Sequence, residues 1–129
     1  MTTVGQVMSR NLLTVDPKMT LREAAASMSD RGVGAILVLS GESVSGILTE
    51  RDVLRAVATG EIEGTHVAAW MTRDPETIDS DESTGQAAAV MIHGGFRHLP
   101  VLDGGKPVGI VSIRDLMKVV VDDESPRGV

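Results

Sequence analysis

The sequence predicts an α/β fold, of the mixed α+β type, built from two copies of one small unit. The first observation is an internal repeat: a shift of 63 positions aligns residues 8–57 with residues 71–120 without a gap, and 17 of the 50 aligned pairs are identical. The second is the alternation of short aliphatic runs with segments of helical periodicity. The third is that Trp70 and Phe96 are the only aromatic residues. Aliphatic side chains must therefore fill the space between sheets and helices.

Each copy is expected to follow the order strand, helix, strand, strand, helix. The run at residues 12–15, matched by residues 76–78, predicts a short first strand. Small and apolar residues in helical spacing then predict helices over residues 20–28 and 83–91.

Local signatures mark both ends of these first helices. Thr20 lies three residues before Glu23, a capping box in which a hydroxyl and a carboxylate satisfy free amides of the first helical turn. Ser83 and Gln86 repeat the pattern in the second copy. Glycines are expected to end both helices: Gly32 and Gly95.

The rest of each copy is expected to form a hairpin that leads into a final helix. An aliphatic strand, a polar turn with glycine and a second aliphatic strand follow one another in both copies. The predicted strands are 35–39 and 45–48 in the first copy and 98–102 and 108–111 in the second, with turns at 40–43 and 103–106.

The predicted domains follow the repeat: residues 1–63 form the first, residues 64–122 the second, and residues 123–129 a polar tail. The joining segment 59–70 has a short helical pattern that matches residues 2–8. About 60 residues make a marginal domain, so the two copies are expected to bury a common core.

Composition narrows the classes of function. Cysteine is absent, which excludes a disulfide framework, a thiolate nucleophile and a cysteine-based metal site. The formal net charge of −6 disfavours general nucleic-acid binding. Neither a signal peptide nor a run of about 18 apolar residues is evident. We therefore expect a soluble, cytoplasmic protein that does not bind membranes.

The most informative motif ends each hairpin, as GILTERD in the first copy and GIVSIRD in the second. Thr49 with Asp52, and Ser112 with Asp115, form capping boxes where a strand runs into a helix. Capping requires no ligand, so one interpretation of the motif is purely structural.

The same geometry can also hold a phosphorylated sugar. A strand-to-helix turn points free amides and the positive helix end outward. An aspartate one turn further on can accept hydrogen bonds from a ribose diol, each contributing on the order of 1.5 to 3 kcal/mol. Gly46 and Gly109 would let a ligand ring approach the backbone. Arg51 and Arg114 could balance phosphate charge.

The doubled motif, the LPVLD strand and the openings VMSRNLLTV and WMTRDPETI together resemble a tandem pair of cystathionine-β-synthase (CBS) domains, called a Bateman module. The resemblance covers residues 4–121. It implies two small mixed sheets packed about a pseudo-twofold axis, with adenosine-containing ligands bound in the clefts between the domains. Expected ligands are AMP, ADP, ATP or S-adenosylmethionine, and no cofactor is required.

The resemblance also implies roles for particular residues. Thr49 and Ser112 would hold phosphate or ribose oxygens, and Asp52 and Asp115 the ribose hydroxyls. The first strands would line the adenine with main-chain contacts, and the RHLPV segment would reach phosphates. The complete expected site comprises Thr14, Val15, Ile36, Gly46, Thr49, Arg51, Asp52, Thr77, Ile78, Arg97, His98, Leu99, Pro100, Gly109, Ser112, Arg114 and Asp115.

The two copies differ where the family's basic residues fall. Arg97 and His98 align with Gly34 and Ala35, so one cleft is expected to present two more positive or donor groups than the other. For His98, a packed structural histidine is the alternative. We expect unequal sites, one of which takes the more highly charged ligand.

Other functions find less support in the sequence. His66, His93 and His98 lack the spacing of a zinc site, and no nucleophile, base and orienting residue come together, so we expect neither a metal site nor an enzyme. Trp70 is expected to pack the joining segment. The expected function is a stand-alone regulatory sensor, a homodimer that can act on a protein partner. An interaction module without nucleotide is the alternative, and single-stranded nucleic-acid binding is a third hypothesis.

Overall fold

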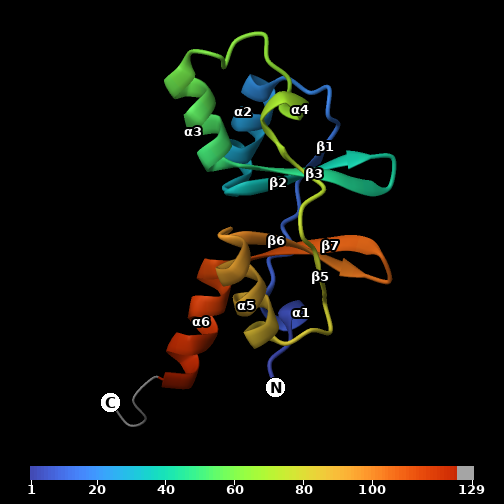
Figure 1. The fold of residues 1–129 in the computed structure, drawn as a ribbon, viewed down its shortest axis with the longest axis vertical. Helices are drawn as coiled ribbons and strands as arrows, with labels where there is room; N and C mark the ends of the chain where they lie inside the picture. The colour runs from blue at the N-terminus through green and yellow to red at the C-terminus, as the bar shows by residue number, and fades with distance from the viewer. Residues whose placement is uncertain (125–129) are drawn as a thin grey trace. The chain divides into compact units, whose positions relative to one another are not determined.

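The computed structural model describes residues 1–124, which form two compact units (Figure 1). Residues 11–75 make up the first-repeat unit. Residues 1–10 join residues 76–124 in the second-repeat unit. Both units are mixed α+β structures with a small sheet, so the predicted fold class is confirmed.

The first-repeat unit is a sheet with helices on one face (Figure 1). Its strands run in the order β1-β2-β3-β4. The first two are parallel, and the other neighbours are antiparallel. The strands are β1 (Thr14–Val15), β2 (Ala35–Ser40), β3 (Ser43–Thr49) and β4 (Thr72–Arg73), and the helices are α2 (Leu21–Arg31), α3 (Glu50–Thr59) and α4 (Val67–Trp70).

The second-repeat unit has the same plan with a sheet of order β5-β6-β7. Its first two strands are parallel and its hairpin is antiparallel, with a register shift at the position that matches the shift in the first unit. The strands are β5 (Ile78–Asp79), β6 (His98–Asp103) and β7 (Lys106–Ser112), and the helices are α1 (Val4–Val7), α5 (Thr84–Gly94) and α6 (Ile113–Glu124).

The first strands differ slightly from the prediction. Strand β1 covers two residues of the expected 12–15, and β5 begins at Ile78, where the expected 76–78 ends. Leu13 instead packs against the core, while its carbonyl accepts a hydrogen bond from the amide of Leu37 at 3.0 Å.

The short helices belong to the unit of the other repeat. Helix α4 packs through the fully buried Val67 into the first-repeat core, and α1 packs through Val4 into the second-repeat core. The chain that follows each short helix pairs with the sheet of the unit in which that helix packs. After α4, Thr72 pairs with Ile47 of β3, and after α1, Ser9 forms the equivalent bridge with Ile110 of β7. The compact units therefore do not follow the repeat boundaries 1–63 and 64–122 in space.

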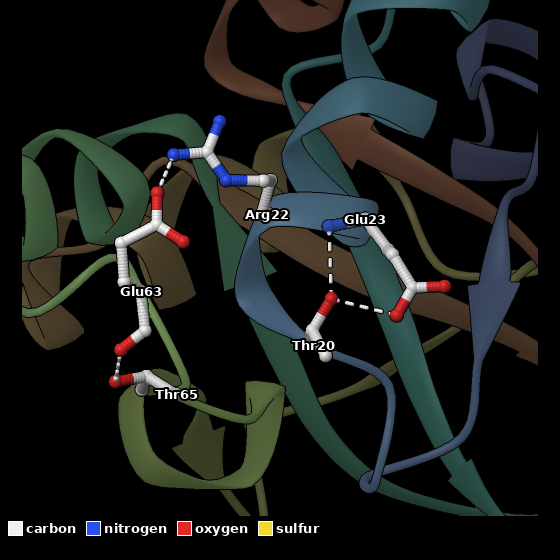
Figure 2. A network of polar contacts seen from close by, with 5 residues as sticks. All are labelled: Thr20, Arg22, Glu23, Glu63 and Thr65. Carbon is white, nitrogen blue, oxygen red and sulfur yellow. Dashed lines mark hydrogen bonds and ion pairs between the residues drawn. The ribbon is translucent and has the colours of Figure 1, made fainter.

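The hydroxyl half of each expected cap of the first helices is confirmed, whereas the Glu23 carboxylate bonds the Thr20 hydroxyl rather than a backbone amide. The hydroxyl of Thr20 accepts a hydrogen bond from the amide of Glu23 at 3.1 Å and donates one to its carboxylate at 2.7 Å (Figure 2). The hydroxyl of Ser83 accepts from the amide of Gln86 at 3.0 Å. Left-handed glycines end both helices, with φ of 65° at Gly32 and 71° at Gly95.

The joining segment is fastened to the start of α2. Arg22 and Glu63 form an exposed ion pair, and the hydroxyl of Thr65 donates to the carbonyl of Glu63 at 3.5 Å (Figure 2). The backbone adds a shorter bond, from the amide of Leu21 to the carbonyl of Thr65 at 2.7 Å. Because an exposed ion pair contributes little, the backbone bonds and the burial of Val67 do most to hold the segment.

Aliphatic side chains fill both cores, as the sequence predicts. In the first-repeat unit, strand residues Ile36, Val38 and Leu48 meet helix residues such as Leu21. Trp70 packs at the edge of that core, which confirms its expected packing role. The second-repeat core has the equivalent strand residues: Leu99, Val101 and Val111.

Helix α6 continues to Glu124, so residues 123 and 124 of the predicted tail are helical. Residues 125–129 lie outside the described part of the chain. Within residues 1–124, the helices are too short or too polar to cross a bilayer.

Candidate ligand-binding site at the strand-to-helix turns

Each hairpin leads directly into a helix, and the first helical amide is already bonded. Thr49 is the extended N-cap residue of α3. The amide of Glu50 donates to the carbonyl of Gly34 at 3.0 Å, and the amide of Ile113 donates to the carbonyl of Arg97 at 2.9 Å. The start of each final helix is thereby held against the residue just before the first hairpin strand.

The aspartate of each motif folds back onto the N-cap residue. Asp52 Oδ2 accepts hydrogen bonds from the amide and the hydroxyl of Thr49 at 2.9 and 3.1 Å. Asp115 Oδ2 accepts the same two bonds from Ser112 at 2.8 and 3.0 Å, and the amide of Asp115 donates to the Ser112 hydroxyl at 3.1 Å. The structural interpretation of the motif as a capping box is therefore confirmed.

Capping uses one oxygen of each carboxylate. Within residues 1–124, Oδ1 of Asp52 and Oδ1 of Asp115 accept no hydrogen bond, and both side chains are only partly buried. A carboxylate offers about four lone-pair sites on its two oxygens. Each aspartate can therefore complete the cap and still accept bonds from a ligand.

Two arginines add positive charge to the same helical turns. Arg51 and Arg114 are exposed, and neither side chain has a hydrogen-bond or ion-pair partner among residues 1–120. Their guanidinium groups carry five donors each and suit phosphate oxygens.

The glycines of the motif have a packing reason that sequence reasoning missed. A Cβ on Gly46 would lie 2.5 Å from Met71 Sδ and 2.9 Å from the carbonyl oxygen of Thr72. A Cβ on Gly109 would lie 2.6 Å from the carbonyl oxygen of Ser9. The space beside each glycine is filled by the crossing segment of the chain, so close approach of a ligand is not needed to explain these glycines.

The basic segment of the second copy lies beside its turn. His98 is opposite Ser112 across β6 and β7, and Arg97 precedes it as an exposed residue. The first copy has Ala35 opposite Thr49. His98 is thus the cross-strand neighbour of the capping residue Ser112, whereas Ala35 occupies the equivalent position in the first copy.

Several expected site residues contribute their side chains to the cores. Val15 and Ile78 are almost fully buried, and Ile36 and Leu99 have no exposed surface. Pro100 is also buried, although it belongs to neither core cluster. The side chains of these five residues are therefore not available to a ligand in this structure. Thr14 begins β1, Thr77 immediately precedes β5, and both residues are exposed.

A cavity of about 370 Å³ lies on one flank of α5, outside the predicted set of residues. Small-molecule sites usually measure about 300 to 1,000 Å³. Two of the residues that line the cavity are sequence neighbours of predicted site residues: Glu76 precedes Thr77, and Phe96 precedes Arg97. The rest of its wall is formed by Gln86, Ala89, Val90, His93 and Gly94.

Gly94 explains how this cavity acquires its aromatic wall. A Cβ at Gly94 would lie 1.9 Å from Phe96 Cε1, so the ring can fold onto the helix only because the side chain is missing. In the described part of the chain, no three acidic or histidine side chains gather in a way that could hold a metal ion.

The fold and its paired turns define an internally duplicated α+β protein with the same capped motif in each copy. The CBS domain model matches residues 4–59 and residues 67–122, so this chain belongs to the CBS domain family. The CBS domain-containing protein YhcV of Bacillus subtilis is 34% identical over 97% of this chain and 90% of its own length. A solved CBS-domain protein from Burkholderia ambifaria is 37% identical, with a TM-score of 0.88 over 99% of this chain and 100% of its own.

Two more distant structures were solved with adenosyl compounds. The CBS domain pair of protein MJ0100, in complex with 5'-methylthioadenosine and S-adenosyl-L-methionine, is 23% identical with a TM-score of 0.88. It covers 96% of this chain and 99% of its own. CBSX2 in complex with AMP, a protein of Arabidopsis thaliana, is 23% identical with a TM-score of 0.81 over the same shares. At this identity the likeness establishes the shared fold.

Proposed function

We propose that this protein is a regulatory sensor that binds adenosine-containing ligands at its two strand-to-helix turns. The observation that carries the proposal is the free Oδ1 of Asp52 and of Asp115, each on a carboxylate whose other oxygen is fixed by a cap. Complexes of two fold neighbours with AMP and with S-adenosyl-L-methionine support this class of ligand.

The hydrogen-bond directions assign the roles at each turn. Oδ1 of the aspartate would accept bonds from the ribose hydroxyls. The hydroxyls of Thr49 and Ser112 already donate to the capping carboxylates. They cannot also donate to a phosphate while the cap is intact, because a hydroxyl has a single proton. Phosphate binding therefore falls to Arg51 and Arg114.

The proposed action is regulatory rather than catalytic. Binding to the folded state stabilises it by RT ln(1 + [L]/Kd), which is about 2.7 kcal/mol at a ligand concentration 100 times Kd. A ligand shifts a conformational equilibrium only by its difference in affinity for the two states. A regulated partner would respond to that shift.

Calorimetric titration with AMP, ADP, ATP and S-adenosylmethionine tests the proposal. We expect Asp52→Ala and Asp115→Ala each to weaken binding at their own turn. Asp30→Ala is the matched control, because this exposed carboxylate lies at the far end of α2 and makes no hydrogen bond within the described chain. Absence of binding for all four ligands at millimolar concentration would exclude the nucleotide function.

A second candidate is a dimerisation or interaction module without nucleotide. Apolar side chains are exposed at equivalent positions of the final helices: Leu54 (68%) and Val57 (55%) on α3, and Met117 (54%) and Val120 (50%) on α6. An isolated exposed apolar residue needs no explanation, but clustered ones indicate contact surfaces. Sedimentation of the wild type and of a Leu54→Gln/Met117→Gln variant tests it: a dimer that the variant disrupts supports this function, and a monomer excludes self-association.

A further inference from the structure

The two strand-to-helix turns differ in charge at one pair of residues that a backbone hydrogen bond joins. In the first-repeat unit, the amide of Glu50 donates to the carbonyl of Gly34. The side chain of Glu50 also lies over this glycine, since a Cβ built on Gly34 would be 3.1 Å from Glu50 Oε1 and 3.4 Å from its Cδ. An exposed carboxylate therefore stands where the helix begins.

The equivalent pair in the second-repeat unit carries the opposite charge. Ile113 replaces the glutamate and Arg97 replaces the glycine, while the same backbone bond joins them at 2.9 Å. The neighbouring arginine and the capping aspartate are the same in both turns. The first pair contributes a formal charge of −1 and the second a formal charge of +1, so the turns differ by two charges at this place.

Neither charge is neutralised by the side chains that the structure describes in residues 1–120. Glu50 and Arg97 are exposed, and their side chains have no ion-pair or hydrogen-bond partner among residues 1–120. A ligand at either turn would therefore experience the charge directly.

We propose that this pair makes the two turns select ligands of different charge, with Glu50 as the specificity-determining residue of the first-repeat unit. The second-repeat unit takes an adenosyl ligand that bears phosphate. In the first-repeat unit, Glu50 offsets the positive charge of Arg51, so this turn binds phosphate more weakly and favours a ligand whose 5' substituent is uncharged or cationic. This inference rests on the proposed function and deepens it.

The effect of Glu50 and Arg97 on ligand affinity is expected to be small, because both side chains are exposed to solvent. Solvent and salt screen exposed charges, so a single exposed pair is usually a weak interaction. We expect one charge at this place to change the affinity for a phosphate by about twofold to fivefold at low salt, and by less as the ionic strength rises. A small effect requires a measurement that resolves each turn.

The backbone amides of Glu50 and Ile113 provide such a measurement, because each reports on its own turn in an ¹⁵N NMR titration. The probes are AMP and adenosine, which differ by the phosphate. In the wild type we expect AMP to be preferred over adenosine more strongly at the amide of Ile113 than at that of Glu50. Glu50→Gln should tighten AMP binding at its own turn by about twofold to fivefold and leave adenosine binding unchanged.

Two matched variants complete the design. Arg97→Gln should weaken AMP at the second-repeat turn by a similar factor. Glu42→Gln removes the same charge from the β2–β3 turn, at the opposite end of the hairpin, and should leave the AMP preference unchanged.

The outcomes separate this inference from the function on which it rests. If both probes bind but the AMP preference is the same at the two turns, or does not respond to Glu50→Gln, the charge selection is wrong and the sensor function stands. If neither probe perturbs either amide, the sensor function fails, and this inference fails with it.

Discussion

Asp115 Oδ2 accepts hydrogen bonds from both the amide and the hydroxyl of Ser112, at 2.8 and 3.0 Å, and leaves Oδ1 of the same carboxylate free among the described residues. Asp52 and Thr49 repeat this relationship. One side chain can thus stabilise the helix and remain available to a ligand, so the structural and functional interpretations of the motif are compatible.

Substitution of Asp115 should separate these two roles. Asp115→Ala removes the cap and should lower the free energy of unfolding by about 0.5 to 2 kcal/mol. It should also weaken ligand binding at that turn by about 1.5 to 3 kcal/mol, the range for a hydrogen bond to a charged group. Chemical denaturation and calorimetric titration measure the two effects.

Asp115→Asn is the conservative partner of that change. Its amide oxygen can still accept a capping bond, but the negative charge is lost, so stability should fall less than in Asp115→Ala while binding falls nearly as much. If Asp115→Ala unfolds more readily and binds ligand with unchanged affinity, the motif serves only to cap the helix.

Alanine at the motif glycines should destabilise the fold without any ligand. Gly46→Ala places a methyl group 2.5 Å from Met71 Sδ and 2.9 Å from the Thr72 carbonyl oxygen, and a backbone oxygen cannot move aside as a side chain can. Overpacking of this kind costs about 1 to 3 kcal/mol. Thermal and denaturant unfolding of the unliganded protein measure the loss.

Gly85→Ala is the matched control for that change. The nearest atom to a Cβ at Gly85 is 3.8 Å away, and the residue lies within α5. Alanine there should be neutral or should stabilise the protein by up to about 1 kcal/mol. Equal stability of Gly46→Ala and the wild type would show that the crossing segment does not press on β3.

The sequence was sufficient for the repeat and for all the longer elements, because both depend on local patterns, but it did not predict the two-residue strand β4. Periodicity located the helices, and Thr20 and Gly32 mark the two ends of α2 as capping chemistry requires. The doubled motif also located the turns. The bounds of β1 were less accurate, because a two-residue strand is defined by its pairing with Leu37 and Val38 rather than by its own pattern.

The sequence could not show how distant segments meet. The space beside Gly46 is filled by Met71, which lies 25 positions later in the chain, and local patterns carry no information about such contacts. The fold of Phe96 over Gly94 was equally invisible, and with it the cavity on α5. The orientation of Glu50 over Gly34 also became evident only in three dimensions.

The ring of Phe96 should respond to a side chain at Gly94. Gly94→Ala puts a Cβ 1.9 Å from Phe96 Cε1, so the ring must leave the helix and the cavity must change shape. We expect a loss of about 1 to 3 kcal/mol. In a double-mutant cycle, Gly94→Ala should cost less when Phe96 is already alanine, because the clash has been removed. Additive effects would show that the ring does not occupy this place.

The exchange of the short helices between repeats leads to a prediction about which unit each helix stabilises. Val4 and Val67 are equivalent and have no exposed surface, but Val4 packs in the second-repeat core and Val67 in the first-repeat core. Val4→Ala should therefore increase hydrogen exchange in β5, β6 and β7, and Val67→Ala should increase it in β2 and β3. Each substitution leaves a cavity and should cost about 1 to 3 kcal/mol.

Trp70 fluorescence, which reports on the first-repeat core, should respond more strongly to Val67→Ala. If Val4→Ala instead loosened β2 and β3, each helix would stabilise its own repeat, and the domains would follow the boundaries 1–63 and 64–122.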